Sequence, residues 1–328
     1  MSFNVVNLQS SATALSEQFS HGGGIEAAAR GWGCEISDIL DLSTGLHPAG
    51  APAWLPEWMQ KHATLAAHYP DTNGEPARSA LAAELTVAPE NVVIIAGAQA
   101  LIEVVFTAME WRSLAIEVPC YSEPLRCARR AGCRLLPFEQ DQPIPQADVL
   151  WWTSPANPHG GDRPFPGGFS GLLDESYMVF AERRRLGLIP GVIRLGSLTK
   201  SLCIPGLRLG YAVADAVSVE RLKQWLPPWP ASTLALHLLP ALLPEADRRD
   251  VAIAVARRRL AELLGRSGWQ LRPSAASFLL ARPEKVMPAF AEHRILVRHF
   301  PEWPQLAGWV RFGLPGSEAD WKRLEEVL

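Results

Sequence analysis

Short apolar runs alternate with helix-forming segments through much of the chain. Runs of this length and composition are typical of buried strands, and helical segments such as residues 101–111 and 123–131 separate them. The expected strands are residues 92–96, 114–118, 134–137, 149–152, 177–180, 192–195 and 207–213. Apolar strands separated by helices at this spacing predict the α/β class, with a mostly parallel sheet covered on both faces.

The two ends of the chain carry smaller units. Before the main alternation, helices are expected at residues 25–30, 54–68 and 76–85, and an extended piece with a turn at 41–48. After it, residues 217–265 are expected to be helical, followed by strands at 268–272, 277–281, 295–298 and 309–314 and a helix at 284–292. The last helix starts at Ser317 to Asp320, which resembles a capping box.

This order of elements predicts a division into three parts. Residues 1–40 form an arm that contributes to the small domain, residues 41–226 form the large domain that holds the ligand site, and residues 227–328 form a smaller α/β domain. The chain of 328 residues is long enough for two such domains.

Composition excludes several classes of function. With 48% hydrophobic and 20% charged residues, the chain fits a globular protein, and its net charge of -3 argues against a nucleic-acid partner. Polar residues and a proline interrupt the most apolar windows, so no membrane span is expected. The first residues lack the pattern of a secretory signal, and the five cysteines lack C-x-x-C spacing. A cytoplasmic protein without a metal site is the expectation.

The stretch from Ser197 to Tyr211 concentrates residues that carry chemistry. It holds a lysine, three small hydroxyl residues, two glycines and an arginine within fifteen positions. A lone lysine after a strand is usually a surface residue, but Lys200 follows Ser-Leu-Thr and precedes Arg208 by eight residues. The stretch indicates that Lys200 forms a Schiff base with an aldehyde cofactor, whose phosphate Ser197, Thr199 and Arg208 hold.

Six features appear in an order that resembles the fold type I enzymes that use pyridoxal phosphate, the aspartate-aminotransferase-like family. They are Gly97-Ala98-Gln99, Tyr121, Asn157 before Pro158, Asp174 with Tyr177, Lys200 with Ser197, Thr199 and Arg208, and Arg311. The resemblance covers nearly the whole chain from about His21. It implies a large domain that binds pyridoxal 5'-phosphate, which acts as an electron sink, and a smaller α/β domain.

The resemblance implies roles in holding the cofactor. Lys200 would bind it and later move a proton, while Asp174 would keep its ring nitrogen charged. Tyr177 and Asn157 would bond the ring oxygen, and Tyr121 would stack on the ring. The phosphate would meet backbone N–H groups of Ala98 and Gln99 after Gly97, together with Ser197, Thr199 and Arg208. Tyr69 would reach the cofactor of a neighbouring subunit, which implies a homodimer with shared sites.

Ordinary structural roles compete at several of these positions. Asp174 could be a cap, Tyr121 and Tyr177 could be core residues, and Asn157 could be a turn residue. A strand, glycine and helix in succession, as around Gly97, is also common.

Three basic residues are candidates for binding the substrate. Arg311 matches the family arginine that grips an α-carboxylate in a bidentate fork, and Arg298 is the expected second basic contact. A solvated charge at a strand end is the alternative for Arg298. His21, with the glycines that follow it, would bind a substrate phosphate, or else belong to an ordinary flexible loop.

A narrower resemblance concerns three segments. Residues 21–30, 41–50 and 199–211 look like those of the threonine-phosphate decarboxylases of cobalamin biosynthesis, close relatives of the histidinol-phosphate aminotransferases. It implies a carboxy-lyase that converts L-threonine O-3-phosphate to (R)-1-aminopropan-2-yl phosphate. An aminotransferase acting on histidinol phosphate or a similar compound is the alternative, and a non-catalytic binding module is a remote one. Gly45 and His47 depart from the asparagine-rich segment of the relatives.

Overall fold

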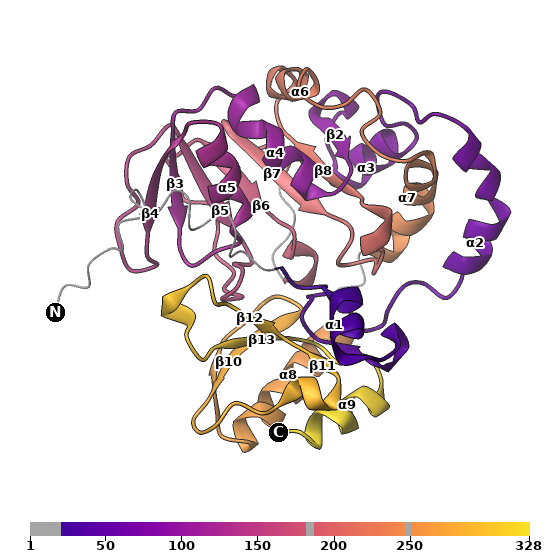
Figure 1. Ribbon diagram of the computed structural model, residues 1–328. Coiled ribbons are helices and arrows are strands. Elements are labelled where there is room, and N and C mark those ends of the chain that lie inside the picture. The colour runs from indigo at the N-terminus through magenta and orange to yellow at the C-terminus, as the bar shows by residue number, and fades with distance from the viewer. Residues whose placement is uncertain (1–20, 182–186, 247–250) are drawn as a thin grey trace.

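A seven-stranded sheet forms the centre of the large domain in the computed structural model, which describes residues 21–181, 187–246 and 251–328 (Figure 1). In spatial order the strands are β2 (Val92–Ile95), β8 (Gly210–Val213), β7 (Val192–Ser197), β6 (Gly171–Asp174), β5 (Val149–Thr153), β3 (Ser113–Glu117) and β4 (Arg134–Phe138). Strands β4, β3, β5, β6 and β7 pair in parallel, and β8 is antiparallel to both β7 and β2. The prediction of an α/β fold with a mostly parallel sheet is therefore confirmed.

The two faces of this sheet are covered differently. Helices α4 (Ala98–Ala108), α5 (Glu123–Arg130) and α6 (Ala216–Lys223) pack on one face, where their apolar residues share a core with those of the central strands. Helices α3 (Ala77–Leu85) and α7 (Thr233–Ala246) pack on the other face, over β2 and β8. Over β5 and β3 that second face is covered by loop residues such as Phe165 and Phe169.

The small domain is built on a four-stranded antiparallel sheet (Figure 1). Its order is β12 (Arg298–His299), β13 (Val310–Gly313), β10 (Phe278–Pro283) and β9 (Trp269–Arg272), and helices α8 (Val251–Arg266) and α9 (Glu318–Glu325) complete it. Strand β1 (Leu40–Asp41) pairs in parallel with β11 (Ile295–Leu296), which brings the segment of α1 (Ile25–Trp32) beside the small domain.

The domain boundaries expected after residues 40 and 226 stay a prediction. The packing adds one detail to them, because α7 shares the core of the large domain whereas α8 shares that of the small one. The arm expected at the N-terminus lies partly outside the described residues, which begin at His21.

The remaining elements are short helices. They are α2 (Leu55–Lys61) and the 3₁₀ helices η1 (Ile36–Asp38), η2 (Ala63–Ala67), η3 (Pro89–Asn91), η4 (Met178–Phe180), η5 (Pro205–Leu207), η6 (Phe290–His293) and η7 (Pro304–Leu306). The capping box at the start of α9 is confirmed, because the Asp320 N–H donates to Ser317 Oγ over 3.2 Å and the Ser317 N–H donates to Asp320 Oδ2 over 2.9 Å.

Two expected elements are wrong. Residues 177–180 form a turn residue followed by η4 instead of a strand, because β6 pairs with β5 and β7 on its two sides and this segment lies beyond the end of β6. Residues 284–292 form no α-helix and contain only the start of η6. Pro288 accounts for the second error, since proline offers no N–H to a helix and disfavours helical backbone at the preceding residue.

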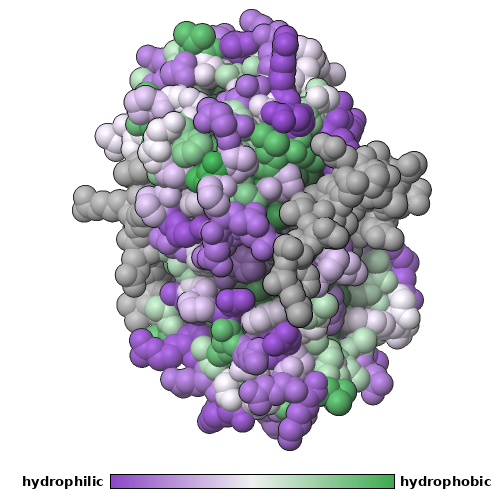
Figure 2. All heavy atoms as spheres, turned by 90° about the vertical axis from the view of Figure 1, so that its left-hand side faces the viewer, coloured by the Kyte–Doolittle hydropathy of each residue, from purple (hydrophilic) through white to green (hydrophobic). Residues whose placement is uncertain are grey.

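The surface is mixed in character. On the face that Figure 2 shows, hydrophilic residues occur at the top, at mid-height and at the bottom, and hydrophobic residues form small separate groups. None of the helices in the described part of the chain combines the length and the apolar character that a membrane span requires.

Candidate active site

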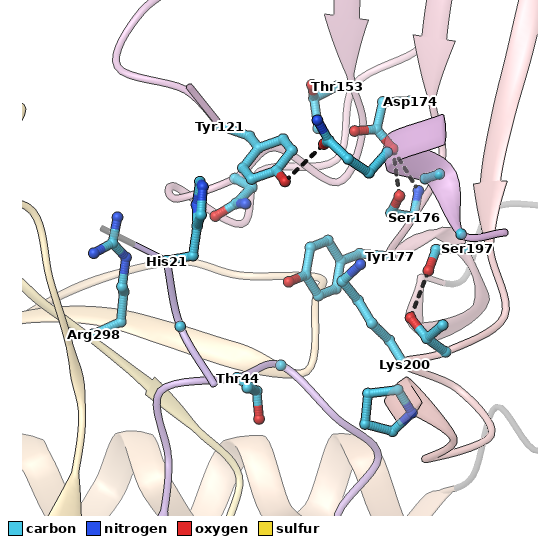
Figure 3. A pocket seen from close by; sticks show the side chains of 18 of the residues that line it. His21, Thr44, Tyr121, Thr153, Asp174, Ser176, Tyr177, Ser197, Lys200 and Arg298 are labelled. Carbon is cyan, nitrogen blue, oxygen red and sulfur yellow. Dashed lines mark hydrogen bonds between the residues drawn. The ribbon is translucent and has the colours of Figure 1, made fainter. Parts of the chain in front are cut away.

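One cavity between the two domains collects nearly all of the predicted site residues. It is lined by His21, Gly97, Ala98, Gln99, Tyr121, Asn157, Asp174, Tyr177, Ser197, Thr199, Lys200, Arg208, Arg298 and Arg311. Figure 3 shows Lys200, Asp174 and Ser197 on one side of this cavity, His21 and Arg298 on the other, and Tyr121 and Tyr177 between them. Tyr69 is the exception, because it is 80% exposed and stacks on Trp229 with ring centroids 4.5 Å apart.

The sheet explains why residues distant in sequence meet here. Gly97 follows β2, Thr153 ends β5, Asp174 ends β6 and Ser197 ends β7. The carboxyl ends of parallel strands lie at one edge of a sheet, which is where α/β proteins bind their ligands. The short strand β6 was not predicted from the sequence. Its pairing with β5 and β7 brings Asp174 to this edge.

Lys200 is held between two fixed segments. It lies three residues beyond β7, and its backbone carbonyl accepts a hydrogen bond of 2.9 Å from the His47 N–H. The Lys200 Nζ lies 4.9 Å from the centroid of the Tyr177 ring, a cation–π distance. The ammonium group is therefore directed into the cavity beside a phenol, as the close-up shows (Figure 3).

Asp174 is a buried carboxylate. Its Oδ1 accepts hydrogen bonds from the Ser176 N–H over 3.0 Å and from Ser176 Oγ over 2.6 Å. Burial raises the pKa of Asp174, although Ser176 and the charge of Lys200 act in the opposite direction. Such a carboxylate would be stabilised by a cationic partner in the cavity, such as a protonated ring nitrogen.

A cradle for an anion surrounds the start of α4. Gly97 has φ +80°, and a Cβ at this position would lie 2.6 Å from an Arg208 guanidinium nitrogen. A Cβ on Gly210 would lie 2.7 Å from the Ala98 backbone nitrogen. The two glycines thus leave the helix N-terminus and the guanidinium side by side, an arrangement that suits a phosphate. The Ser197 and Thr199 hydroxyls, 2.8 Å apart, also line this part of the cavity.

Tyr121 lies where the two ends of the cavity meet. Its hydroxyl donates to Gln99 Oε1 over 3.2 Å, and its ring is 5.7 Å from the His21 ring, with the two planes tilted. Burial raises the pKa of Tyr121, and the charge of Glu123 adds to this effect. The phenol therefore stays protonated and keeps its aromatic face in the cavity.

The guanidinium of Arg311 is hydrogen-bonded to two different segments. It donates from Nη1 to Asn157 Oδ1 over 2.6 Å and from Nη2 to the Ser43 carbonyl over 2.8 Å. Its buried Nε has no partner among the described residues. Asn157 therefore links the substrate side to the cofactor side, and its amide N–H groups are the donors it could offer to a ring oxygen.

Arg298 is buried at the far end of the cavity. It forms an ion pair with Glu302, whose side chain is 2% exposed, and it lies over the Phe300 ring at 4.9 Å. Burial lowers the pKa of Arg298, Glu302 opposes this, and Arg311 adds to it. The alternative of a solvated charge at a strand end is wrong, because the residue is 8% exposed.

Several lining residues were not predicted. Thr44, Leu46, Cys120, Thr153, Ser176, Phe300 and Glu302 also face the cavity. Glu302 had a weak signal, since it follows Arg298 by four residues. Gly45 lines the cavity as well, and a Cβ there would lie 2.7 Å from a Tyr177 ring carbon. His47 is buried and is not among the residues that line this cavity.

The carboxyl edge of this sheet holds a lysine (Lys200), a buried carboxylate (Asp174) and a cradle for a phosphate. These groups define a pyridoxal-phosphate site, and the residues present fit that cofactor. The class is therefore a pyridoxal-phosphate-dependent enzyme of fold type I.

Comparison with known proteins leads to the family. Residues 169–328 match the family model "Aminotransferase class I and II". A threonine-phosphate decarboxylase of Pseudomonas aeruginosa is 31% identical, over 94% of this chain and 96% of the relative. The chain belongs to the aminotransferase class I and II family, and its cofactor is pyridoxal 5'-phosphate.

Two solved structures share the fold. L-threonine-O-3-phosphate decarboxylase from Porphyromonas gingivalis has a TM-score of 0.77 at 21% identity, covering 88% of this chain and 98% of that one. Histidinol-phosphate aminotransferase from Sinorhizobium meliloti, in complex with pyridoxal-5'-phosphate, has a TM-score of 0.82 at 21% identity, covering 97% and 96%. The aspartate-aminotransferase-like fold expected from the motifs is thus confirmed.

Proposed function

We propose that the protein decarboxylates L-threonine O-3-phosphate to (R)-1-aminopropan-2-yl phosphate, the aminopropanol unit of cobalamin. The observation that carries the proposal is the gathering of three basic groups at the substrate end of the cavity. Arg311 lies beside Asn157 and directly opposite Arg298 in the pairing of β13 with β12, and Arg298 and His21 lie at the end away from Lys200 (Figure 3). A substrate with both a carboxylate and a phosphate suits such a cluster of basic groups, and the similarity to the Pseudomonas aeruginosa decarboxylase supports this substrate.

The residues have distinct tasks in this reaction. The cofactor supplies the electron sink for the pair released when the bond between Cα and the carboxylate breaks. Arg311 binds the carboxylate and sets its direction, while Arg298 and His21 hold the phosphate so that Cα cannot rotate freely. Lys200 returns a proton to Cα after CO₂ has left.

The alternative is an aminotransferase that acts on histidinol phosphate or a similar compound. Lys200, Asp174 and Arg208 would serve both reactions in the same way, because both need the cofactor and a proton donor. The reactions differ in which bond to Cα is held perpendicular to the plane of the cofactor ring. Histidinol phosphate has no carboxylate, so a carboxylate held by Arg311 distinguishes the proposed substrate from it. For an amino-acid substrate, the direction in which Arg311 holds the carboxylate decides between the two reactions.

The proposed assembly is a homodimer with shared sites. Tyr69 lies outside the cavity of its own chain and presents an exposed ring beside Trp229. This position suits a residue that reaches toward a neighbouring subunit, and the mass of the protein in solution tests the assembly.

The test is a direct assay of the cofactor-loaded protein. With L-threonine O-3-phosphate we expect one CO₂ for each (R)-1-aminopropan-2-yl phosphate formed. In parallel, histidinol phosphate is supplied with 2-oxoglutarate and glutamate is measured. Glutamate production without CO₂ release would contradict the decarboxylase and favour the aminotransferase.

A further inference from the structure

Glu123, at the start of α5, contacts side chains from both ends of the cavity. Its Oε2 accepts a hydrogen bond of 2.8 Å from Gln99 Nε2, and its Oε1 lies 3.2 Å from His21 Nε2. Gln99 in turn accepts from the Tyr121 hydroxyl. Gln99, His21 and Tyr121 line the cavity, whereas Glu123 is not among its lining residues. We infer that Glu123 is a positioning residue that couples the cofactor-stacking tyrosine to the substrate-binding histidine.

Charge compensation keeps this carboxylate in place. Glu123 is 6% exposed, and Arg126 donates to it from Nε over 2.8 Å and lies within 2.6 Å through Nη2. A buried carboxylate with such a partner is fixed in position, because its charge is neutralised and its oxygens are hydrogen-bonded. Glu123 can therefore act as a rigid reference point for the side chains around it.

The position of Glu123 determines how Gln99 is oriented. The Gln99 Nε2 donates to Glu123 over 2.8 Å and to Glu103 over 3.0 Å. Ionised carboxylates only accept hydrogen bonds, so the amide must turn its NH₂ group toward them. Its Oε1 is then left to accept the hydrogen bond from Tyr121, which fixes the tilt of that ring.

His21 depends on Glu123 in a different way. It belongs to the N-terminal segment rather than to the sheet, and its side chain is 47% exposed. With Nε2–H turned toward Glu123, the imidazole is held against the Tyr121 ring, and the doubly protonated ring keeps Nδ1–H to donate to an anionic ligand. The inference rests on the proposed function in one respect, namely that His21 binds the substrate phosphate.

The chain offers a matched control for a test. Glu117, at the end of β3, is also paired with an arginine, Arg163, and its side chain is 13% exposed, but the structure gives it no contact with Gln99 or His21 among the described residues. In the cofactor-loaded full chain, Glu123→Gln is expected to raise KM for L-threonine O-3-phosphate roughly tenfold and to change kcat less than about twofold, as for the loss of one charge-assisted hydrogen bond. Glu117→Gln is expected to leave both constants near those of the parent.

A double variant separates coupling from a general structural effect. If Glu123 acts through His21, Glu123→Gln has no further effect on KM in a His21→Ala background. Additive effects, or an unchanged KM in Glu123→Gln alone, would overturn the inference. Should Glu123→Gln fail to fold, Glu123→Asp keeps the charge beside Arg126 and shortens the reach to His21, so the same rise in KM is expected.

Calorimetric titration with inorganic phosphate makes the result independent of the reaction. Relative to the cofactor-loaded parent, phosphate binding is expected to weaken roughly tenfold in Glu123→Gln and to stay unchanged in Glu117→Gln. If the parent releases no CO₂ but this pattern of binding is found, the proposed function fails and the inference stands. If CO₂ is released and Glu123→Gln binds phosphate as the parent does, the inference fails alone.

Discussion

The two ends of the cavity are built in different ways. The cofactor end is formed by backbone and residues at the ends of β2, β6 and β7, with Gly97 and Gly210 allowing the close approaches. The substrate end comes from separate segments, namely the N-terminal segment, β12 and β13. There each basic group is held by another side chain or a carbonyl, as Arg298 is by Glu302.

This difference suggests how one fold can serve several reactions. Groups fixed by strand ends cannot move without disturbing the sheet, so the cofactor chemistry is tied to the fold. Groups held by side-chain pairs can be changed by one or two substitutions that leave the sheet intact. Reaction and substrate choice should therefore depend on the second set, and variants can test this division.

The largest effect is expected at the cofactor end. Lys200→Ala should lower kcat on the order of 10⁴-fold, because it removes both the attachment of the cofactor and the proton donor. The absorbance band of the lysine-bound cofactor should also disappear. Lys322→Ala is the control, since that side chain is 79% exposed on α9. Normal activity and an unchanged spectrum in Lys200→Ala would show that the cofactor end is wrongly assigned.

A smaller effect is expected from Arg311→Lys at the substrate end. Lysine cannot reproduce the planar fork that contacts Asn157 and the Ser43 carbonyl and still grip a carboxylate. We expect kcat/KM to fall roughly 100-fold, as for a lost hydrogen bond between charged groups, while the cofactor spectrum stays that of the parent. Arg282→Lys, at an exposed position on neighbouring β10, should change neither. If Arg311→Lys also lost the absorbance band of the bound cofactor, the division of the cavity into a cofactor end and a substrate end would be wrong.

The two ends of the cavity also differ in how well their residues could be predicted from the sequence. Lys200, Asp174 and Arg208 occur in local motifs, so their meeting follows from strands of a parallel sheet that end at one edge. Glu302 lies in no motif, and only its spacing of four residues from Arg298 indicates their ion pair. Glu123 lies in no motif either, and its contact with His21 depends on how the N-terminal segment packs beside α5. The same limit applies to β6, a strand of four residues that is recognised only by its pairing with β5 and β7.

The smallest effect concerns the free energy of unfolding of the protein without cofactor. It tests whether the buried Asp174 carboxylate destabilises the native state when no cofactor is bound. Burial raises the pKa of Asp174 above its unfolded value. Below the unfolded pKa both states hold the proton, so the carboxyl adds no penalty there. As pH rises toward and through the folded pKa, the native state must ionise a desolvated group, and its stability falls.

Asp174→Asn removes that ionisation, and its amide oxygen can still accept from Ser176. The cofactor-free variant should therefore be more stable than the parent at neutral pH, and the difference should shrink as pH falls toward the unfolded pKa of an aspartate.

Asp215→Asn at the N-cap of α6 is the control, and it should be less stable than the parent at neutral pH, because hydrogen bonds from Ser218 lower the pKa of Asp215. Its carboxylate stabilises the native state at neutral pH, and this contribution is lost as pH falls. Urea unfolding of the three proteins at several pH values measures both differences. If Asp174→Asn were no more stable than the parent at neutral pH, the carboxylate would be satisfied by the protein alone, and it would not need the charge of a cofactor ring to offset its burial.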